Sequence, residues 1–267
     1  MNRSDRSQFK ESDMSKLKLK IMSDLHFEYH SDAGQNWIKQ LDPSGVDILI
    51  LAGDIAEVYG DGLKKALVQF CELYPEVIFV PGNHEYYRSS ITEVEQALKE
   101  LRVIPNLHIL TRKTVVIKEQ RFVGATLWFT KRDEPDQQMW QLRLNDFHKI
   151  RGGFESWVYS EAQKDAQYLN DEIQIGDVVV THHIPSARGV ASRWQDSIEG
   201  FGRFFVHSLP ETLITKAQLW CHGHGHDSVR SERLNHTLLA NPFGYLNHEE
   251  NPNFDAKLIF ETKLFSS

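Results

Sequence analysis

Five apolar runs along the chain each end in aspartate, asparagine or histidine side chains. Two of these runs, residues 46–54 and 77–85, show no alternation of apolar and polar residues, which is typical of strands covered on both faces. Ligands of open α/β sheets bind at the carboxyl ends of the strands. The pattern therefore predicts an α/β fold with a polar site at one edge of a sheet. The side chains at the five ends are Asp24 and His26, Asp54, Asn83 and His84, His182 and His183, and His224 and His226.

Helical spacing follows the second and third of these runs. An amphipathic pattern between them predicts a helix, and the order strand, helix, strand favours a parallel pair of strands. Ser90 and Glu93 form a capping box, which predicts the start of another helix after the third run. The apolar face of the first helix is Leu63, Leu67, Phe70 and Tyr74, and that of the second is Ile91, Val94, Leu98 and Leu101.

The other segments differ in period and polarity. Residues 17–21 alternate leucine or isoleucine with lysine, which predicts a half-buried strand, and residues 114–128 predict two strands around a polar turn. Segments 129–157 and 186–208 are long, polar and rich in Trp, Phe and Arg. Loops of that length are often lids or binding loops, so we expect these two near a site.

Composition is that of an ordinary globular protein. The 267 residues are 40% apolar and contain no repeat or linker, so we expect a flexible tail over 1–16 and a single domain over 17–267. The net charge of -7 argues against sequence-blind binding of nucleic acid. Residues 1–16 lack the apolar core of a signal peptide, and no run approaches the roughly 18 apolar residues that span a bilayer. Cys71 and Cys221 predict free thiols in a reducing compartment, hence a cytoplasmic protein without a membrane partner.

The chemistry of the side chains at the run ends points to metal ions. Each of them alone has an ordinary structural explanation, such as a helix cap, a turn residue or a buried histidine, but five ends of the same kind favour a shared site. Carboxylate, imidazole and amide oxygen suit Mn, Fe, Zn or Co, and the absence of cysteine argues against a closed structural zinc site. Seven candidate ligands suit two ions that share a carboxylate. Two ions roughly 3.5–4 Å apart can clamp an in-line phosphoryl displacement and acidify a water nucleophile, which is phosphoester hydrolysis.

The motifs themselves resemble those of the calcineurin-like metallophosphoesterases. They are DLH (24–26), GD (53–54), GNHE (82–85), THH (181–183) and GHGH (223–226), in this order over residues 17–226. The closing ANPFGY (240–245) is similar to the tail of small bacterial members whose substrate is unassigned. The resemblance implies a four-layer αββα sandwich of two mixed β-sheets flanked by helices, with a dimetal site at the carboxyl ends of the strands. It also implies a metal-dependent hydrolase with a bridging hydroxide nucleophile.

The same resemblance assigns a role to each matching residue. Asp54 would bridge two divalent ions, manganese, iron, zinc or similar. His84 would lie beside the phosphate as the general acid, consistent with imidazole chemistry at neutral pH, or would stabilise the transition state. Glu85 would orient His84 or a neighbouring ligand. The ligands of one ion would be Asp24, His26 and His226, and those of the other Asn83, His182 and His224.

Several neighbouring residues have more than one interpretation. His182 is preferred to His183 as a ligand because it directly follows the strand and Thr181. His183 then supports a ligand or packs in the core, and His222 is the last packed residue of its strand. Other residues near the motifs are possible substrate contacts, although a solvated loop face is expected for most of them. They are Glu28, His30, Arg88, Asn145, Asp146, His148 and Arg151.

Three functions are compatible with the motifs. The first is hydrolysis of a small phosphoester, either a monoester or a diester. The second is a cyclic-nucleotide or nucleotide phosphodiesterase, because members that cleave cyclic nucleotides share all five motifs. The third is a catalytically silent metal-binding module whose aromatic loops dock a partner, which the complete set of ligands disfavours. A phosphoprotein substrate is also disfavoured, because GDIAEVYG (53–60) replaces the longer GD-x-VDRG of the protein Ser/Thr phosphatases. We further expect Trp140, Arg143 and Trp194 to cover the site and to influence discrimination among substrates.

The bridging role of Asp54 gives a direct test. The Asp54→Ala variant should lose both ions and all hydrolysis, because one carboxylate serves both sites. The Asn83→Ala variant should mainly weaken the binding of one ion. Metal analysis of the purified variants measures this, and two tightly held ions in the Asp54→Ala protein would refute the assignment.

Overall fold

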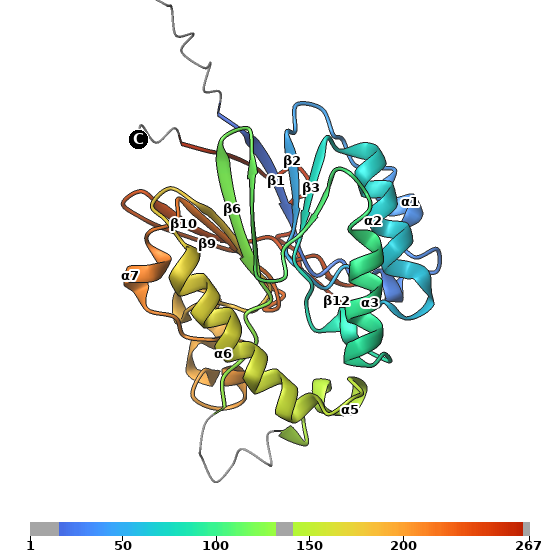
Figure 1. Cartoon of the computed structure of the whole chain (residues 1–267), viewed down its shortest axis with the longest axis vertical. Helices are drawn as coiled ribbons and strands as arrows, with labels where there is room; N and C mark the ends of the chain where they lie inside the picture. The colour runs from blue at the N-terminus through green and yellow to red at the C-terminus, as the bar shows by residue number, and fades with distance from the viewer. Residues whose placement is uncertain (1–15, 132–140, 264–267) are drawn as a thin grey trace, which may run out of the picture.

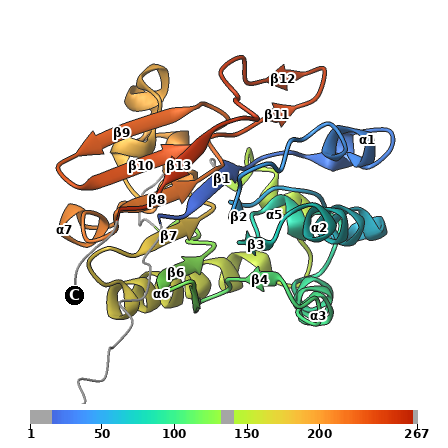
Figure 2. The ribbon, with the colours of Figure 1, turned by 90° about the horizontal axis from the view of Figure 1, so that it is seen from above.

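Two β-sheets pack face to face, and helices cover both outer faces (Figure 1). The computed structural model describes residues 16–131 and 141–263. Helices on one side of the molecule cover the sheet that contains the first strands, and helices from the second half of the chain cover the other sheet (Figures 1 and 2). This confirms the four-layer arrangement of two mixed sheets that the family resemblance implies. The predicted tail lies almost entirely outside the described residues.

The first sheet has five strands in the order β13-β1-β2-β3-β4. Its four neighbouring strands from β1 to β4 are parallel, and β13 pairs antiparallel with β1. This confirms the predicted parallel pair, which is β2 and β3. The strands are β1 (Lys18–Met22), β2 (Ile48–Leu51), β3 (Glu76–Phe79), β4 (Leu107–Ile109) and β13 (Ile259–Glu261).

The second sheet has six strands in the order β5-β6-β7-β8-β10-β9. The predicted hairpin is β5 with β6, and the parallel strands β6, β7, β8 and β10 follow. The strands are β5 (Lys113–Ile117), β6 (Gln120–Ala125), β7 (Val178–Thr181), β8 (Leu219–His222), β9 (Val229–Arg233) and β10 (His236–Ala240), and a separate small hairpin is β11 (Gly244–Tyr245) with β12 (Glu249–Glu250).

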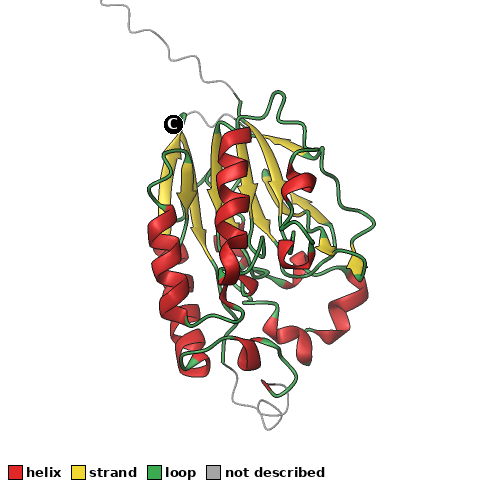
Figure 3. Ribbon diagram, turned by 90° about the vertical axis from the view of Figure 1, so that its right-hand side faces the viewer, coloured by secondary structure: helices red, strands yellow, loops and turns green. Residues whose placement is uncertain are grey.

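Helices flank both sheets, as Figure 3 shows for one face. The α-helices are α1 (Gln35–Ile38), α2 (Gly62–Leu73), α3 (Ile91–Leu101), α5 (Asp146–Lys149), α6 (Phe154–Glu172) and α7 (Glu211–Ile214). The short 3-10 helices are η1 (Phe27–Tyr29), η2 (Tyr59–Asp61), η3 (His84–Tyr86), η4 (Ala187–Gly189), η5 (Ser192–Ser197) and η6 (Phe201–Phe204). Among the described residues, every helix is too short or too polar to span a bilayer.

Burial on both faces explains the apolar runs of the sequence. Ile48 and Ile50 of β2 lie in the core between the sheets, whereas Leu49 and Leu51 pack on the helix side. In β7, Val178 and Val180 face the other sheet in the same way. Side chains alternate between the faces of a strand, so a strand covered on both sides needs apolar residues at every position. The strand ends are thereby fixed at one edge of the two sheets.

The prediction of a half-buried first strand is wrong. The side chain of Lys20 in β1 is buried, with 3% of the residue exposed, because β1 lies in the interior of the first sheet. Its ammonium group donates hydrogen bonds to the carbonyl oxygens of Asp42 and Ala256 at 3.0 and 2.8 Å. Burial lowers the pKa of Lys20. A long side chain thus crosses the covered face and ends among carbonyl groups, which alternation alone does not reveal.

Two predicted helices are present, and two segments expected to be loops contain helices. The capping box of α3 is complete, since Ser90 accepts from the Glu93 backbone and Glu93 accepts from the Ser90 backbone. Segment 129–157 contains α5 and the first turn of α6, and segment 186–208 contains η4, η5 and η6. The first turns of α6 pack Phe154 and Val158 into the core beside α3. Among the described residues of these segments, many polar side chains lie on the exposed faces of helices.

Candidate metal centre

The candidate ligands lie on loops that leave the carboxyl ends of β1, β2, β3, β7 and β8. Backbone hydrogen bonds join these loops directly. Asp24 N donates to Gly53 O at 2.9 Å, His26 N donates to Asp54 O at 3.0 Å, and Gly223 N donates to His182 O at 3.0 Å. These bonds join neighbouring strand ends within each sheet, and His224 N from the second sheet donates to Asp24 Oδ1 of the first at 2.9 Å, so strand ends from both sheets meet at a common centre.

Five of the candidate ligands have left-handed backbone conformations. The φ angles are 52° for Asp24, 46° for His26, 56° for Asp54, 68° for His224 and 50° for His226. Such angles are uncommon for residues other than glycine and cost free energy. Their concentration at one place indicates that the loops are shaped to aim these side chains inward.

The first set of candidate ligands is Asp24, His26 and His226. The Nε2 atoms of His26 and His226 lie 3.1 Å apart, and His226 Nε2 lies 3.5 Å from Asp24 Oδ1. One ligand atom from each residue falls within 4.8 Å of the others. His26 donates its Nδ1 proton to Glu28 at 3.0 Å, which leaves the Nε2 lone pair for the centre.

The second set is Asp54, Asn83, His182 and His224. His182 Nε2 lies 3.0 Å from Asn83 Oδ1 and 3.4 Å from Asp54 Oδ2. His182 Nδ1 donates to the Ala52 carbonyl at 2.9 Å, so its Nε2 also carries a lone pair. The Nε2 of His224 is buried without a hydrogen-bond partner among the described residues.

Asp54 lies between the two sets. Its Oδ2 is 3.4 Å from His182 Nε2 and 3.8 Å from His26 Nε2. Its Oδ1 accepts a hydrogen bond from the backbone of His84 at 2.8 Å. This placement is the one that a carboxylate shared by two ions requires, so the predicted bridging role is compatible with the geometry.

Two glycines make room for the carboxylates. A Cβ atom at Gly82 would lie 2.2 Å from Asp54 Oδ1, and one at Gly223 would lie 2.5 Å from Asp24 Oδ2. Such contacts are impossible for real side chains, so any larger residue would displace a candidate ligand. The glycines of GNHE and GHGH are thus required by the close approach of their loops to the two aspartates.

The electrostatics of the centre favour a cation. Burial raises the pKa of Asp24 to about 7 and raises that of Asp54 well above its ordinary value. Burial also lowers the pKa values of His26 and His224 far below the ordinary range, which keeps these imidazoles neutral. Buried carboxylates normally have a cationic partner, and neutral imidazole is the form that binds metals. The residues present therefore fit divalent metal ions.

His84 is arranged differently from the candidate ligands. Both of its ring nitrogens have partners, since Nδ1 donates to Glu28 at 2.8 Å and Nε2 lies 3.3 Å from the Tyr245 hydroxyl. Glu28 Oε1 thus accepts from both His26 and His84. One ring nitrogen of His84 still falls within 4.8 Å of ligand atoms of His26 and Asp54. The side chain therefore lies beside the centre with its orientation fixed from two sides.

Glu85 connects the loops after β2 and β3. Its buried carboxylate accepts hydrogen bonds from the backbone N–H groups of Asp54, Ile55 and Gly82 at 3.0, 2.7 and 2.6 Å. These contacts hold the backbone of Asp54 against the GNHE loop. The predicted orienting role of Glu85 is compatible with this position, which acts on Asp54 rather than on His84.

The alternatives raised by the THH and GHGH motifs differ clearly in position. His183 is fully buried behind His224, with ring centroids 4.3 Å apart, and both of its ring nitrogens lack hydrogen-bond partners among the described residues. His222 is buried in β8 with its Nδ1 near the Gly223 carbonyl. The described geometry thus brings His182, and neither of these two, into contact with Asp54 and Asn83.

The residues predicted as possible substrate contacts differ in burial. Glu28 and Asp146 are buried at the centre, and Asp146 bonds to the Asn83 amide. Arg88 is half exposed and forms an ion pair with Glu57. Tyr245 is the last residue of the ANPFGY motif, and its hydroxyl reaches His84, a contact for which the sequence motif predicts no role.

The predicted covering loops are described only in part. Trp194 is 45% exposed, and its indole N–H donates to Asp227, the residue after His226. Arg143 is exposed on the segment before α5. Trp140 lies outside the described residues. The contact between Trp194 and Asp227 places one predicted covering residue at the edge of the centre.

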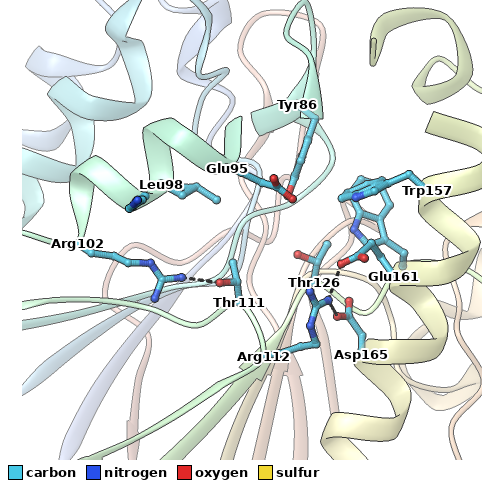
Figure 4. A pocket seen from close by; sticks show the side chains of 12 residues that line it. Tyr86, Glu95, Leu98, Arg102, Thr111, Arg112, Thr126, Trp157, Glu161 and Asp165 are labelled. Atoms are coloured by element: carbon cyan, nitrogen blue, oxygen red, sulfur yellow. Dashed lines mark hydrogen bonds and ion pairs between the residues drawn. The ribbon is translucent and has the colours of Figure 1, made fainter. Parts of the chain in front are cut away.

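A separate cavity of about 230 Å³ lies between α3 and α6 (Figure 4). Tyr86 and Trp157 line it from above, and Arg112 forms ion pairs with Glu161 and Asp165 along one wall. None of the candidate ligands lines this cavity. It is therefore distinct from the metal centre, although Tyr86 belongs to the same short helix as His84.

Comparisons with known proteins identify the family. The family model described as calcineurin-like phosphoesterase matches residues 17–228, and the chain belongs to this family. The uncharacterized protein L509 of Acanthamoeba polyphaga mimivirus is 25% identical over an alignment of 268 positions. The alignment covers 87% of this chain and 92% of that protein.

Solved structures share the fold at low sequence identity. The phosphopantetheinyl hydrolase of Mycobacterium tuberculosis has a TM-score of 0.65 at 16% identity, covering 87% of this chain and 91% of that one. A dimetal phosphatase from Danio rerio has a TM-score of 0.52 at 12% identity, covering 89% and 90% of the two chains. The protein TT1561 of Thermus thermophilus has a TM-score of 0.54 at 13% identity, covering 85% and 90%.

The buried charge of Asp24 predicts a pH dependence of stability in the metal-free protein. The folded state raises the pKa of Asp24 from 3.8 to about 7, so between these values it binds more protons than the unfolded state. The contribution of Asp24 to stability is therefore lost as the pH rises through about 7. Asparagine has nearly the same shape as aspartate but no charge, so the Asp24→Asn variant should not show this loss of stability.

Urea unfolding in EDTA measures the effect. The unfolding free energy of Asp24→Asn minus that of the wild type should rise by about 1 kcal/mol per pH unit from pH 5 to pH 7. Parallel stability curves would show that Asp24 has no raised pKa.

Proposed function

We propose that the protein hydrolyses a small phosphoester, using two divalent metal ions. The observation that carries this proposal is the convergence of two buried carboxylates, an amide oxygen and four imidazoles at the ends of five strands. Asp24, His26 and His226 would hold one ion, and Asn83, His182 and His224 would hold the other. Asp54 would bind both.

The ions would supply a positively charged site for phosphoryl oxygens and would acidify a water for attack on phosphorus. The chain itself provides their positions. Glu85 holds the backbone of Asp54 against the loop that carries Asn83. Hydrogen bonds at Nδ1 fix the ring orientations of His26 and His182.

His84 is proposed to donate a proton to the leaving oxygen. Glu28 accepts from Nδ1, so the proton for transfer would be carried at Nε2, the atom that faces Tyr245. Burial lowers the pKa of His84 well below its ordinary value, so the free protein holds a neutral ring. The negative charge of a bound phosphoester, together with Glu28, favours the protonated form in the complex. Tyr245 would then exchange its contact with His84 for one with the substrate.

The substrate is proposed to be small, with neither nucleic acid nor membrane as a partner. The family relationship supports phosphoester hydrolysis, and the names of two structural neighbours, a phosphopantetheinyl hydrolase and a dimetal phosphatase, describe reactions of that kind. We also propose a cytoplasmic location, because Cys71 and Cys221 are free thiols. Manganese is the first ion to test, since the ligand set combines oxygen and imidazole.

A substrate screen tests the proposal. Protein stripped with EDTA is assayed after addition of Mn²⁺, Fe²⁺, Zn²⁺ or Co²⁺ with p-nitrophenyl phosphate, bis(p-nitrophenyl) phosphate and cyclic AMP. We expect metal-dependent hydrolysis of at least one nitrophenyl ester. Binding of two ions without turnover of any phosphoester would instead support the silent metal-binding module.

The role of His84 predicts a dependence on the leaving group. The His84→Asn variant should keep both ions and the fold while its turnover falls by roughly 10²–10⁴, the usual value for general acid catalysis. Nitrophenolate leaves with little need of a proton, so the loss should be larger for alkyl phosphoesters than for nitrophenyl esters. Loss of metal, or an equal loss on both kinds of ester, would assign His84 to ligation or phosphate binding.

A further inference from the structure

Asp146 is a buried carboxylate next to a candidate metal ligand. It begins α5, far from the motifs in sequence, and none of its residue surface is exposed. Its Oδ1 accepts hydrogen bonds from Asn83 Nδ2 at 2.9 Å and from the Tyr87 hydroxyl at 2.7 Å. Its Oδ2 is buried without a hydrogen-bond partner among the described residues. Among the described residues, this carboxylate therefore accepts its hydrogen bonds from Asn83 and Tyr87.

The orientation of the Asn83 amide decides whether it can bind a cation. The two ends of an amide have nearly the same size, but only the oxygen is a ligand, and a half turn would present N–H groups to the centre instead. A carboxylate only accepts hydrogen bonds, so Asp146 favours the orientation with Nδ2 toward itself. In that orientation Asn83 Oδ1 lies 3.0 Å from His182 Nε2, on the side of the metal centre.

The backbone holds Asp146 in place for this contact. Arg88 N donates to Lys149 O at 3.0 Å, and Arg151 N donates to Ser89 O at 3.0 Å. The segment from α5 to Arg151 is therefore fixed to the turn that follows the GNHE loop. Burying a carboxylate costs several kcal/mol unless its interactions compensate. A contact needed only for packing would be served by an uncharged side chain.

We propose that Asp146 is a positioning residue that fixes the amide of Asn83 with its oxygen toward the metal centre. The inference rests on the proposed two-metal function, in which Asn83 is a ligand. It predicts that removal of Asp146 weakens one ion and leaves the other in place. Removing a side chain that hydrogen-bonds to a metal ligand typically lowers metal affinity by about 10–100-fold.

A double-mutant cycle separates orientation from general structural support. Mn²⁺ binding at equilibrium is measured for the wild type, Asp146→Leu, Asn83→Asp and the double variant. A carboxylate at position 83 has oxygen at both ends and no wrong orientation. We expect Asp146→Leu to weaken one Mn²⁺ site by about 10–100-fold in the wild-type background. In the Asn83→Asp background the same change should have no effect or should strengthen binding, because it removes a repelling carboxylate.

The Tyr87→Phe variant is the matched control. It removes the other hydrogen bond to Asp146 Oδ1 and also the longer bond of 3.3 Å that the Tyr87 hydroxyl accepts from Asn83 Nδ2. The 2.9 Å bond from Asn83 Nδ2 to Asp146 remains, so Mn²⁺ affinity should change less than in Asp146→Leu. Circular dichroism and urea unfolding test whether each variant is folded. If Asp146→Leu does not fold, Asp146→Ser replaces it, because the serine side chain is too short to reach Asn83.

Two results would overturn the proposal. One is unchanged Mn²⁺ affinity in Asp146→Leu, and the other is the same loss in both backgrounds, which would mean that Asp146 only supports the fold. Wild-type protein that binds fewer than two Mn²⁺ ions would refute the two-metal function itself, and with it the role of Asn83. That result is seen before any variant is made, so the two failures are distinguishable.

Discussion

The buried carboxylates of Asp24 and Asp54 face imidazoles, with no lysine or arginine paired to either of them among the described ion pairs. Burial in these surroundings raises the pKa values of both acids. Negative charge buried without a cation is unfavourable, and burial lowers the pKa values of the nearby His26 and His224, which keeps these two imidazoles neutral. The rest of the site follows from this constraint, because the loops, the glycines and the left-handed backbone bring these groups together where a divalent cation would satisfy all of them.

Three further carboxylates determine how the central groups are oriented. Glu28 receives the Nδ1 protons of His26 and His84, Glu85 receives the backbone N–H groups around Asp54, and Asp146 receives the amide of Asn83. All three contact the loop after β3, and Glu28 and Glu85 also reach the loops after β1 and β2. The described centre is therefore surrounded by hydrogen-bond acceptors that leave ligand lone pairs pointing inward, and it combines residues from both sheets with one from α5.

The sequence predicts most of the fold because the main strands are covered on both faces. Such strands need apolar residues at every position, as in β2 and β7, and this pattern is visible without a structure. The capping box at Ser90 likewise locates α3. Lys20 was misinterpreted because a lysine can cross a covered face and end at carbonyl groups. Helix α6 was missed because its exposed face makes the segment polar.

The candidate ligands and the orienting role of Glu85 could be predicted from the motifs, whereas the roles of Glu28, Asp146 and Tyr245 could not. Asp24, Asp54 and His182 lie shortly after the ends of β1, β2 and β7, so their position along the chain indicates a shared edge. Glu28 lies two residues after His26, yet only its contact with His84 reveals what it does. Asp146 and Tyr245 reach the centre from distant segments. Their contribution depends on tertiary contacts, which leave no local pattern in the chain.

The central claim is that two ions share Asp54. Anomalous X-ray diffraction from crystals soaked in Mn²⁺ tests it most directly. The account predicts two anomalous peaks roughly 3.5–4 Å apart, one bound by Asp24, His26 and His226, the other by Asn83, His182 and His224, with Asp54 contacting both. A single peak, or a peak bound by His84 in place of one of these ligands, would contradict it.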